Sequence, residues 1–365
     1  TGRFNYKAYK PGPGASGLVT TEDTILGFMY EYLPEMPAFT TYKSLSGGTN
    51  GDKLNINQLY TELETAYSNI ENYPVDIVVP MQATIDATKE GSSSDTGLIQ
   101  QVNAGFHTQL GAFLEELTEN VDETIGIIGV EPTTATDPGS VSAWVDKLTI
   151  VRPGHLTRPA NVMSTFDNRL VQIVAFEPVY GNDLENLTYS SSGATAYAGL
   201  VASLPPHMSP LNKTINNIVN LRYRLSKRQL ERMIDSRYVV ANASRTGTNR
   251  FVVTDDPTSA ARGSDYASLA TVRIVVLAMN VVRAVAEPFV GQPNTNAQLL
   301  AMKQAITSGL RTLVDPNIGA LNGFDFEIVS TPAMRARNLV NIELVLVPAF
   351  TMKVIRTIVR LKANI

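Results

Sequence analysis

Hydrophobic positions in the first part of the chain alternate between helical and extended spacing. After a glycine-rich loop, apolar residues recur every three or four positions, which is typical of an amphipathic helix, at Leu59, Leu63, Ala66, Tyr67 and Ile70. The apolar run Val75 to Val79 follows and predicts a short buried strand.

The alternation continues to residue 205. The pattern predicts a helix over 96–120, a strand over 123–130, a helix around Trp144, a strand over 169–179 and a small-residue helix over 191–205. Short strands that are apolar on both faces and alternate with helices are typical of a mainly parallel sheet. We therefore predict an α/β domain over 40–204, preceded by a turn-rich connecting segment over 1–39 that is the remainder of an N-terminal region.

A polar, proline-rich stretch over 205–217 separates this domain from the rest. It carries Pro205, Pro206 and Pro210, which restrict backbone φ and remove main-chain donors. Two interpretations have nearly equal weight: a semi-rigid strap that transmits movement between domains, and an ordinary surface linker.

After the strap, helices come first and strands later. A helix with Ser226 as its N-cap leads into a strand within 226–244, and long helices are predicted over 266–286 and 296–313. Strand candidates follow over 324–330, 338–348 and 353–361. Helices followed by strands favour a second, α+β domain over 218–365.

The last strand candidate has a distinct pattern over 354–365. Apolar or uncharged residues, namely Val354, Ile355, Thr357, Val359 and Leu361, alternate imperfectly with Arg356, Arg360 and Lys362. Such a strand is either an edge protected by its own charges or an arm that adds to a neighbour's sheet. The spacing alone favours neither.

Composition places the chain among globular proteins. Its 365 residues are 44% hydrophobic and 18% charged, and the absence of cysteine excludes a disulfide scaffold and thiolate metal sites. No secretory leader pattern follows Thr1. The longest apolar run, residues 267–291, carries Arg273, Asn280 and Arg283 at helical spacing, which favours a helix with one wet face over a membrane span.

The net charge of −4 is unevenly distributed. Residues 207–365 hold 20 lysines and arginines against 10 acidic residues, a balance of +10, and the remainder has −14. One basic cluster comprises Arg222, Arg224, Lys227, Arg228, Arg232 and Arg237. With a single neighbouring aromatic residue, Tyr223, and no known motif, nucleic-acid binding is a weak alternative, and contact with an acidic protein surface explains the charge equally well. Simple solvation of both charged faces is the remaining alternative.

No pattern points to catalysis, a cofactor or a metal. His107, His155 and His207 share no ligand spacing. The loop over 46–53 resembles a phosphate loop but has Asp52 between glycine and lysine and Leu54 in place of the required hydroxyl. The acidic residues of 113–126 fit a solvated helix face.

The order of several motifs resembles the tail sheath proteins of contractile bacteriophage tails. The resemblance is carried by "AYAGLVASLPPHMSPLNKTINNI", "NRFVVTDDPTSA", "SDYASLATVRIVVLAMNVVRAVAEPFVGQPN", "GALNGFDFEIVSTP" and "NLVNIELVLVPAFTMKVIRTIVRL". The segments "LSGGTNG" and "YPVDIVVP" are similar to the loop and first strand of the family's variable domain.

The resemblance implies a structural protein of the virion tail and not an enzyme. It implies stacking of copies as six-fold helical rings around an inner tail tube, and contraction that drives the tube through the host envelope during genome delivery. Further implied partners are baseplate and tail terminator proteins, without direct nucleic-acid contact or membrane insertion, after assembly in the bacterial cytoplasm. Residues 354–365 would be the intersubunit arm, and the basic cluster would face the tube.

Two alternatives stay open: a non-contractile tube or shell protein, and an α/β enzyme with an unrecognised site. Family members also carry a further N-terminal portion with a second arm. Since the sequence starts at Thr1, that portion is either missing or outside this sequence.

Overall fold

The computed structural model describes residues 56–71, 73–81, 83–85, 96–119, 124–133, 137–151, 168–180, 192–244, 250–260, 263–315 and 318–353. They all belong to one unit, residues 55–365. The expected connecting segment over 1–39, the loop over 46–53 and the arm over 354–365 lie outside the described residues.

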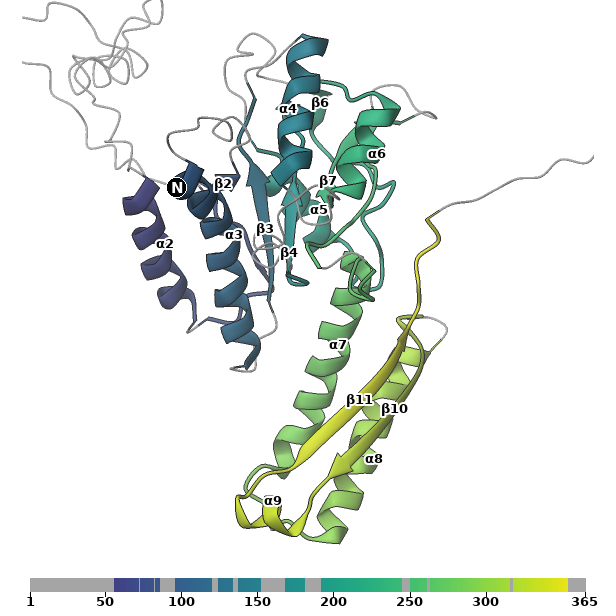
Figure 1. Ribbon diagram of the computed structural model, residues 1–365. Coiled ribbons are helices and arrows are strands. Elements are labelled where there is room, and N and C mark those ends of the chain that lie inside the picture. The colour runs from purple at the N-terminus through teal and green to yellow at the C-terminus, as the bar shows by residue number, and fades with distance from the viewer. Residues whose placement is uncertain are drawn as a thin grey trace, which may run out of the picture. The chain divides into compact units, whose positions relative to one another are not determined.

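A parallel sheet forms the centre of the larger hydrophobic core (Figure 1). Its members are β1 (Ile77–Val78), β2 (Thr84–Ile85), β3 (Ile125–Val130), β4 (Val171–Val174) and β7 (Tyr238–Val239). The order is β1-β3-β4-β7, with β2 paired to the second half of β3, and every pair is parallel. All residues of β3 and β4 are buried, which confirms the predicted apolar, mainly parallel sheet.

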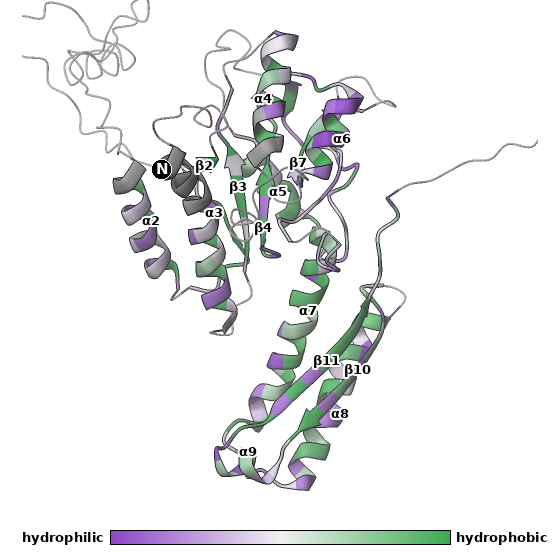
Figure 2. Ribbon diagram, viewed as in Figure 1, coloured by the Kyte–Doolittle hydropathy of each residue, from purple (hydrophilic) through white to green (hydrophobic). Residues whose placement is uncertain are grey.

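Among the described residues, five helices surround this sheet, namely α2 (Ile56–Ile70), α3 (Thr96–Glu119), α4 (Pro138–Val151), α5 (Ala194–Ser203) and α6 (Lys227–Asp235). Helices α3, α5 and α6 pack on its strands, while α2 packs on α3 and α4 packs on α6. A Cβ on Gly126 of β3 would lie 2.7 Å from Leu114 Cδ1 of α3, so a glycine is needed for this approach. The hydropathy colouring shows β3 and β4 as largely hydrophobic (Figure 2).

The last strand of the sheet comes from beyond the strap. Helix α6 begins at a capping box in which Ser226 and Gln229 exchange hydrogen bonds, and this confirms the predicted N-cap. β7 follows directly and pairs with β4. The sheet therefore draws on residues from both sides of 205–217, while the division into two domains stays a prediction.

Two small antiparallel pairs lie beside the sheet. β5 (Pro178–Tyr180) pairs with β6 (Ile218–Leu221), and β8 (Ala241–Ala243) pairs with β9 (Phe251–Val253).

A second hydrophobic core is built from the long helices and a β-hairpin. Its elements are α7 (Leu269–Ala286), the 3-10 turn η2 (Glu287–Phe289), α8 (Asn296–Val314), β10 (Leu321–Val329), α9 (Pro332–Ala336) and β11 (Asn341–Pro348). Both long helices and two of the three late strands match the predicted ranges. β10 and β11 are antiparallel, with Phe326 opposite Leu344.

Helix α7 contributes to both cores. Leu269 and Val272 belong to the larger core, and Ile274, Ala278 and Val282 belong to the second. By length and composition alone, the segment Leu269–Phe289 could cross a membrane. Its two arginines nevertheless donate to main-chain carbonyls of the protein, Arg273 to Leu204 and Arg283 to Thr118.

Candidate assembly surface

The β10–β11 hairpin has one apolar and one mixed face. Alternate side chains pack on the second core, at Phe324, Phe326, Ile328, Ile342, Leu344 and Leu346. The other residues point away from the helices, because successive side chains of a strand alternate between its faces. The hairpin is thus anchored through one face only.

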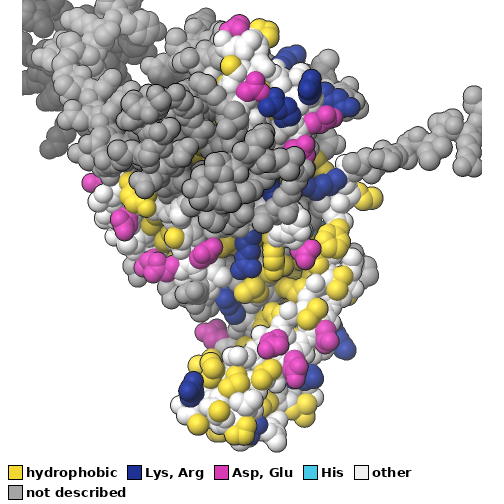
Figure 3. Space-filling view, in the orientation of Figure 1, with side chains coloured by type: hydrophobic (Ala, Val, Ile, Leu, Met, Phe, Trp, Pro, Cys, Tyr) yellow, Lys and Arg dark blue, Asp and Glu magenta, His cyan; other side chains and the backbone are white. Residues whose placement is uncertain are grey.

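The outward face combines acidic and branched apolar side chains. Asp325, Glu327 and Glu343 are exposed, and Val345 and Val347 are 63% and 47% exposed. In the space-filling view, acidic and hydrophobic side chains lie side by side over this hairpin (Figure 3). Together these residues form the outer face of the hairpin.

Both outer edges of the hairpin lack a neighbouring strand among the described residues. β10 pairs only with β11 in this part of the chain, so half of the main-chain donors and acceptors of each strand point away from the pair. An open edge of this kind is a template for a strand from another chain. Its length of nine residues in β10 and eight in β11 is sufficient for such pairing.

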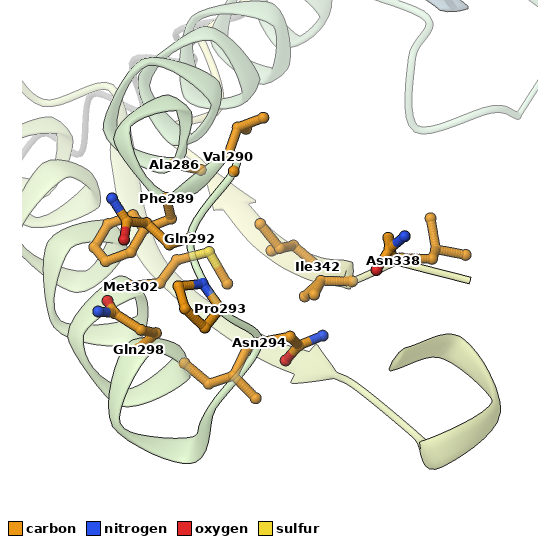
Figure 4. Close-up of a pocket in the computed structure, with 14 residues that line it drawn as sticks. Ala286, Phe289, Val290, Gln292, Pro293, Asn294, Gln298, Met302, Asn338 and Ile342 are labelled. Atoms are coloured by element: carbon orange, nitrogen blue, oxygen red, sulfur yellow. The ribbon is translucent and has the colours of Figure 1, made fainter. Parts of the chain in front are cut away.

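An apolar pocket of about 570 Å³ lies where α7 turns into α8. Figure 4 shows Phe289, Pro293 and Met302 together, with Ile342 of β11 across from them. Val290 at its rim is 82% exposed. None of its lining residues is charged, so the pocket offers no acid–base group.

The chain is tied down where it leaves β11. Lys353 Nζ lies 2.7 Å from Asp255 Oδ1 and 3.3 Å from Asp256 Oδ1. Asp256 is fully buried, and its Oδ2 accepts hydrogen bonds from Ser268 Oγ at 2.9 Å and Ala270 N at 3.4 Å. Burial raises the pKa of Asp256, and the Lys353 ammonium opposes that rise. One buried carboxylate thus contacts both the first turn of α7 and Lys353.

The strap is attached along much of its length. Asn212 N and Ile215 N donate to the carbonyls of Val253 and Phe251, and Arg273 of α7 donates to the carbonyl of Leu204 at 2.8 Å. Of the three prolines, Pro205 is exposed, Pro206 is half-buried and Pro210 is buried. These hydrogen bonds hold the strap against β9 and α7. Its role in transmitting movement from one domain to the other stays a prediction.

The residues of the basic cluster have different environments. Arg224, Lys227, Arg228 and Arg232 are exposed, and Arg232 forms an ion pair with Asp146. Arg237 is only 6% exposed, at a left-handed backbone position with φ of 65°. Arg222 is mostly buried and lies 3.8 Å from Glu177. A charge run in the sequence cannot distinguish these cases, and a tube contact stays a prediction.

Glu177 is the buried carboxylate nearest to a conventional site. It follows β4, at the carboxyl edge of the parallel sheet where α/β enzymes bind ligands. Its Oε1 accepts a hydrogen bond from Thr133 N at 2.5 Å, and its exposed fraction is 3%. Burial raises its pKa to about 7, although the Thr133 hydrogen bond and Arg222 oppose this. The groups that contact Glu177 belong to the protein itself, which favours a structural role for this carboxylate.

The other sequence candidates for chemistry are not brought together. His107 is buried inside the larger core, His207 is half-buried in the strap, and His155 lies outside the described residues. Glu115 and Glu116 are exposed on α3. In the described ranges, no group of three or more His, Cys, Asp and Glu residues could hold a metal ion.

The sequence matches no protein-family model and no curated protein. Solved structures do match. A chain of the anti-feeding prophage (AFP) baseplate covers 73% of this chain with 66% of its own length, at 14% identity and a TM-score of 0.52. The AFP helical sheath in its contracted state covers 71% with 67% of its length, at 13% identity and a TM-score of 0.50.

A sheath tail protein from Desulfitobacterium hafniense covers 83% of this chain with 58% of its own length, at 15% identity and a TM-score of 0.53. The chain therefore spans about three fifths to two thirds of the structures that it matches. At these identities the likeness concerns the fold. The chain has the fold of contractile sheath proteins.

Proposed function

We propose that this protein is a tail sheath subunit, a structural component without enzymatic activity. Copies stack as six-fold helical rings around an inner tube in the virion tail and contract to drive the tube through the host envelope. The shared fold supports this proposal, since two of the matching structures are a baseplate and a contracted helical sheath. The observation that carries it is the β10–β11 hairpin, with one anchored face and two edges unpaired among the described residues.

In this proposal, residues 354–365 of one copy add as a strand to the hairpin of another copy. Main-chain hydrogen bonds along an open edge provide affinity, and alternating side chains provide specificity. The anchoring of Lys353 determines the point from which this arm starts.

Deletion of residues 354–365 is expected to prevent polymerisation while leaving the subunit folded. The residues that build both hydrophobic cores in the described part of the chain all precede residue 354, so we expect them to keep their packing. Negative-stain microscopy and sedimentation of the purified protein measure the polymer fraction, and circular dichroism checks folding. Lys303→Ala, on the exposed side of α8, is the control variant. Normal tubes or rings from the deletion variant contradict the proposal.

The inner tube is a further proposed partner, bound through the exposed arginines and lysine of the basic cluster. Attraction between exposed charges is screened over about 8 Å at physiological salt. We therefore expect binding of sheath to purified tube to weaken when salt rises from about 0.05 M to about 0.5 M. Co-sedimentation measures the fraction of sheath bound to the tube. If this fraction does not change with salt concentration, the basic cluster does not form the tube contact.

The other class of function, an α/β enzyme, has one observation in its favour: Glu177 at the carboxyl edge of the sheet. Its Oε1 accepts a hydrogen bond from Thr133 N, and its Oε2 lies in an ion pair 3.8 Å from Arg222 Nε, without a hydrogen bond among the described residues. A structural role for Glu177 is therefore sufficient to explain its position at the edge of the sheet, and no bound substrate is required.

A further inference from the structure

Two acidic side chains face each other across the β10–β11 hairpin. Glu327 is directly opposite Glu343, and Asp325 lies two residues along on the same face. All three are exposed, and no ion pair links them to a basic residue within the described ranges. Like charges in direct cross-strand register destabilise a hairpin. This arrangement lowers the stability of the isolated subunit, which points to positively charged side chains supplied by another chain.

Residues 354–365 have the complementary pattern. In an extended strand, alternate residues share a face. Arg356, Ile358, Arg360 and Lys362 would then form a mainly basic face, and Ile355, Thr357, Val359 and Leu361 an apolar face. The hairpin likewise has an apolar face toward the helices and an acidic face away from them.

A strand added to either edge of the hairpin must turn its apolar face toward the helices and its basic face outward. Only then does it extend both the apolar and the charged face of the hairpin. Its apolar residues then extend the layer of Phe326 and Leu344, and its basic residues lie beside Asp325 and Glu327 at the β10 edge or beside Glu343 at the β11 edge. A shift of one residue would turn the arginines toward the apolar layer, which strongly disfavours that register. The charges thus select the face and the register of the incoming strand.

The starting point of the segment favours a second copy over the same chain. Lys353 lies five residues beyond the end of β11 and is bound to Asp255 and Asp256, which are outside the core of the hairpin. Lys353, the last described residue, is therefore held by a part of the chain other than the hairpin.

We propose that Asp325, Glu327 and Glu343 are the specificity-determining residues of the hairpin. They recognise Arg356, Arg360 and Lys362 of a second copy of this chain. The inference rests on the proposed sheath function and adds the charges that decide which strand is accepted and which way it faces.

The test uses two full-length variants with opposite charge reversals. The hairpin variant is Glu327→Lys with Glu343→Lys, and the arm variant is Arg356→Glu with Arg360→Glu. Each alone places like charges together, and we expect the subunit concentration needed for half-maximal polymerisation to rise at least about tenfold. Sedimentation measures the polymer, and thermal unfolding checks that each subunit is folded.

Mixing the two variants in equal amounts is the decisive experiment. Each altered hairpin then meets an oppositely charged arm on the other variant, so polymerisation is expected to return to within about threefold of the original protein. A control variant with Glu62→Lys and Glu64→Lys, on the exposed face of α2, has the same change of net charge as the hairpin variant. It is expected to polymerise normally.

The outcomes separate this inference from the proposed function. If the unaltered protein forms no polymer, the sheath proposal fails. If it polymerises and the reversals change nothing, the acidic face does not select the arm. If the four changes together in one chain restore polymers but the mixture does not, the pairing is within one subunit and the inference is overturned.

Discussion

Replacement of Asp256 by alanine is expected to lower the free energy of unfolding by about 3 to 5 kcal/mol, the range for breaking a buried charged network. The Asp256 side chain is fully buried and accepts from Ser268 Oγ and Ala270 N at the start of α7. Its removal leaves Ser268 Oγ and Ala270 N without this acceptor inside the core, while Lys353 keeps Asp255 Oδ1 at 2.7 Å.

Asp255 supplies a matched control. Its Oδ1 lies 2.7 Å from Lys353 Nζ, whereas Oδ1 of Asp256 lies 3.3 Å away. The side chain of Asp255 is 19% exposed, and that of Asp256 is fully buried. Because Lys353 itself is 39% exposed, water screens the ion pair, and Asp255→Ala is expected to cost only about 1 kcal/mol. Urea unfolding measures both variants. Equal losses would show that the ion pair matters and the burial does not.

The stability of the subunit is expected to fall by about 3 kcal/mol as pH rises from about 4.5 to about 7, through Glu177 alone. Burial raises the pKa of this carboxyl from 4.5 to about 7. Between these values the folded protein keeps a proton that the unfolded chain releases, so increasing pH favours unfolding. The contribution is fully present below pH 4.5 and is lost as pH passes the folded-state pKa.

Glu177→Gln isolates this effect because the amide does not titrate. Groups facing Glu177 include Arg222, which lowers its pKa, and Glu131, which raises it; both are kept in the variant. The difference in unfolding free energy between the original protein and Glu177→Gln is expected to change across pH 5 to 8 by up to about 3 kcal/mol. Glu64→Gln, on exposed α2, is the control with a constant difference. A pH-independent difference for Glu177→Gln would place its pKa outside this interval.

Local patterns in the sequence were sufficient for the elements with strong periodicity. The long apolar runs predict α7, α8, β10 and β11, and Ser226 with Gln229 three residues later is a recognisable capping box. The alternation within 324–330 and 338–348 also shows which residues share a face. It could therefore have identified the acidic outer face, although the direct opposition of Glu327 and Glu343 depends on the register.

Other features depend on contacts between distant residues, which a single sequence does not specify. β7 has only two residues and acquires its place in the sheet by pairing with β4, more than 60 residues earlier. Arg222 and Arg237 belong to the same charge run as Arg224, but tertiary packing removes them from the surface. The burial of Glu177 and Asp256 likewise follows from packing, so the sequence alone carries no signal that identifies either residue.

The membership of α7 in both hydrophobic cores has a mechanical consequence. A force that acts on the second core therefore reaches the larger core through the one continuous helix Leu269–Ala286. The two ends of this helix are loaded together.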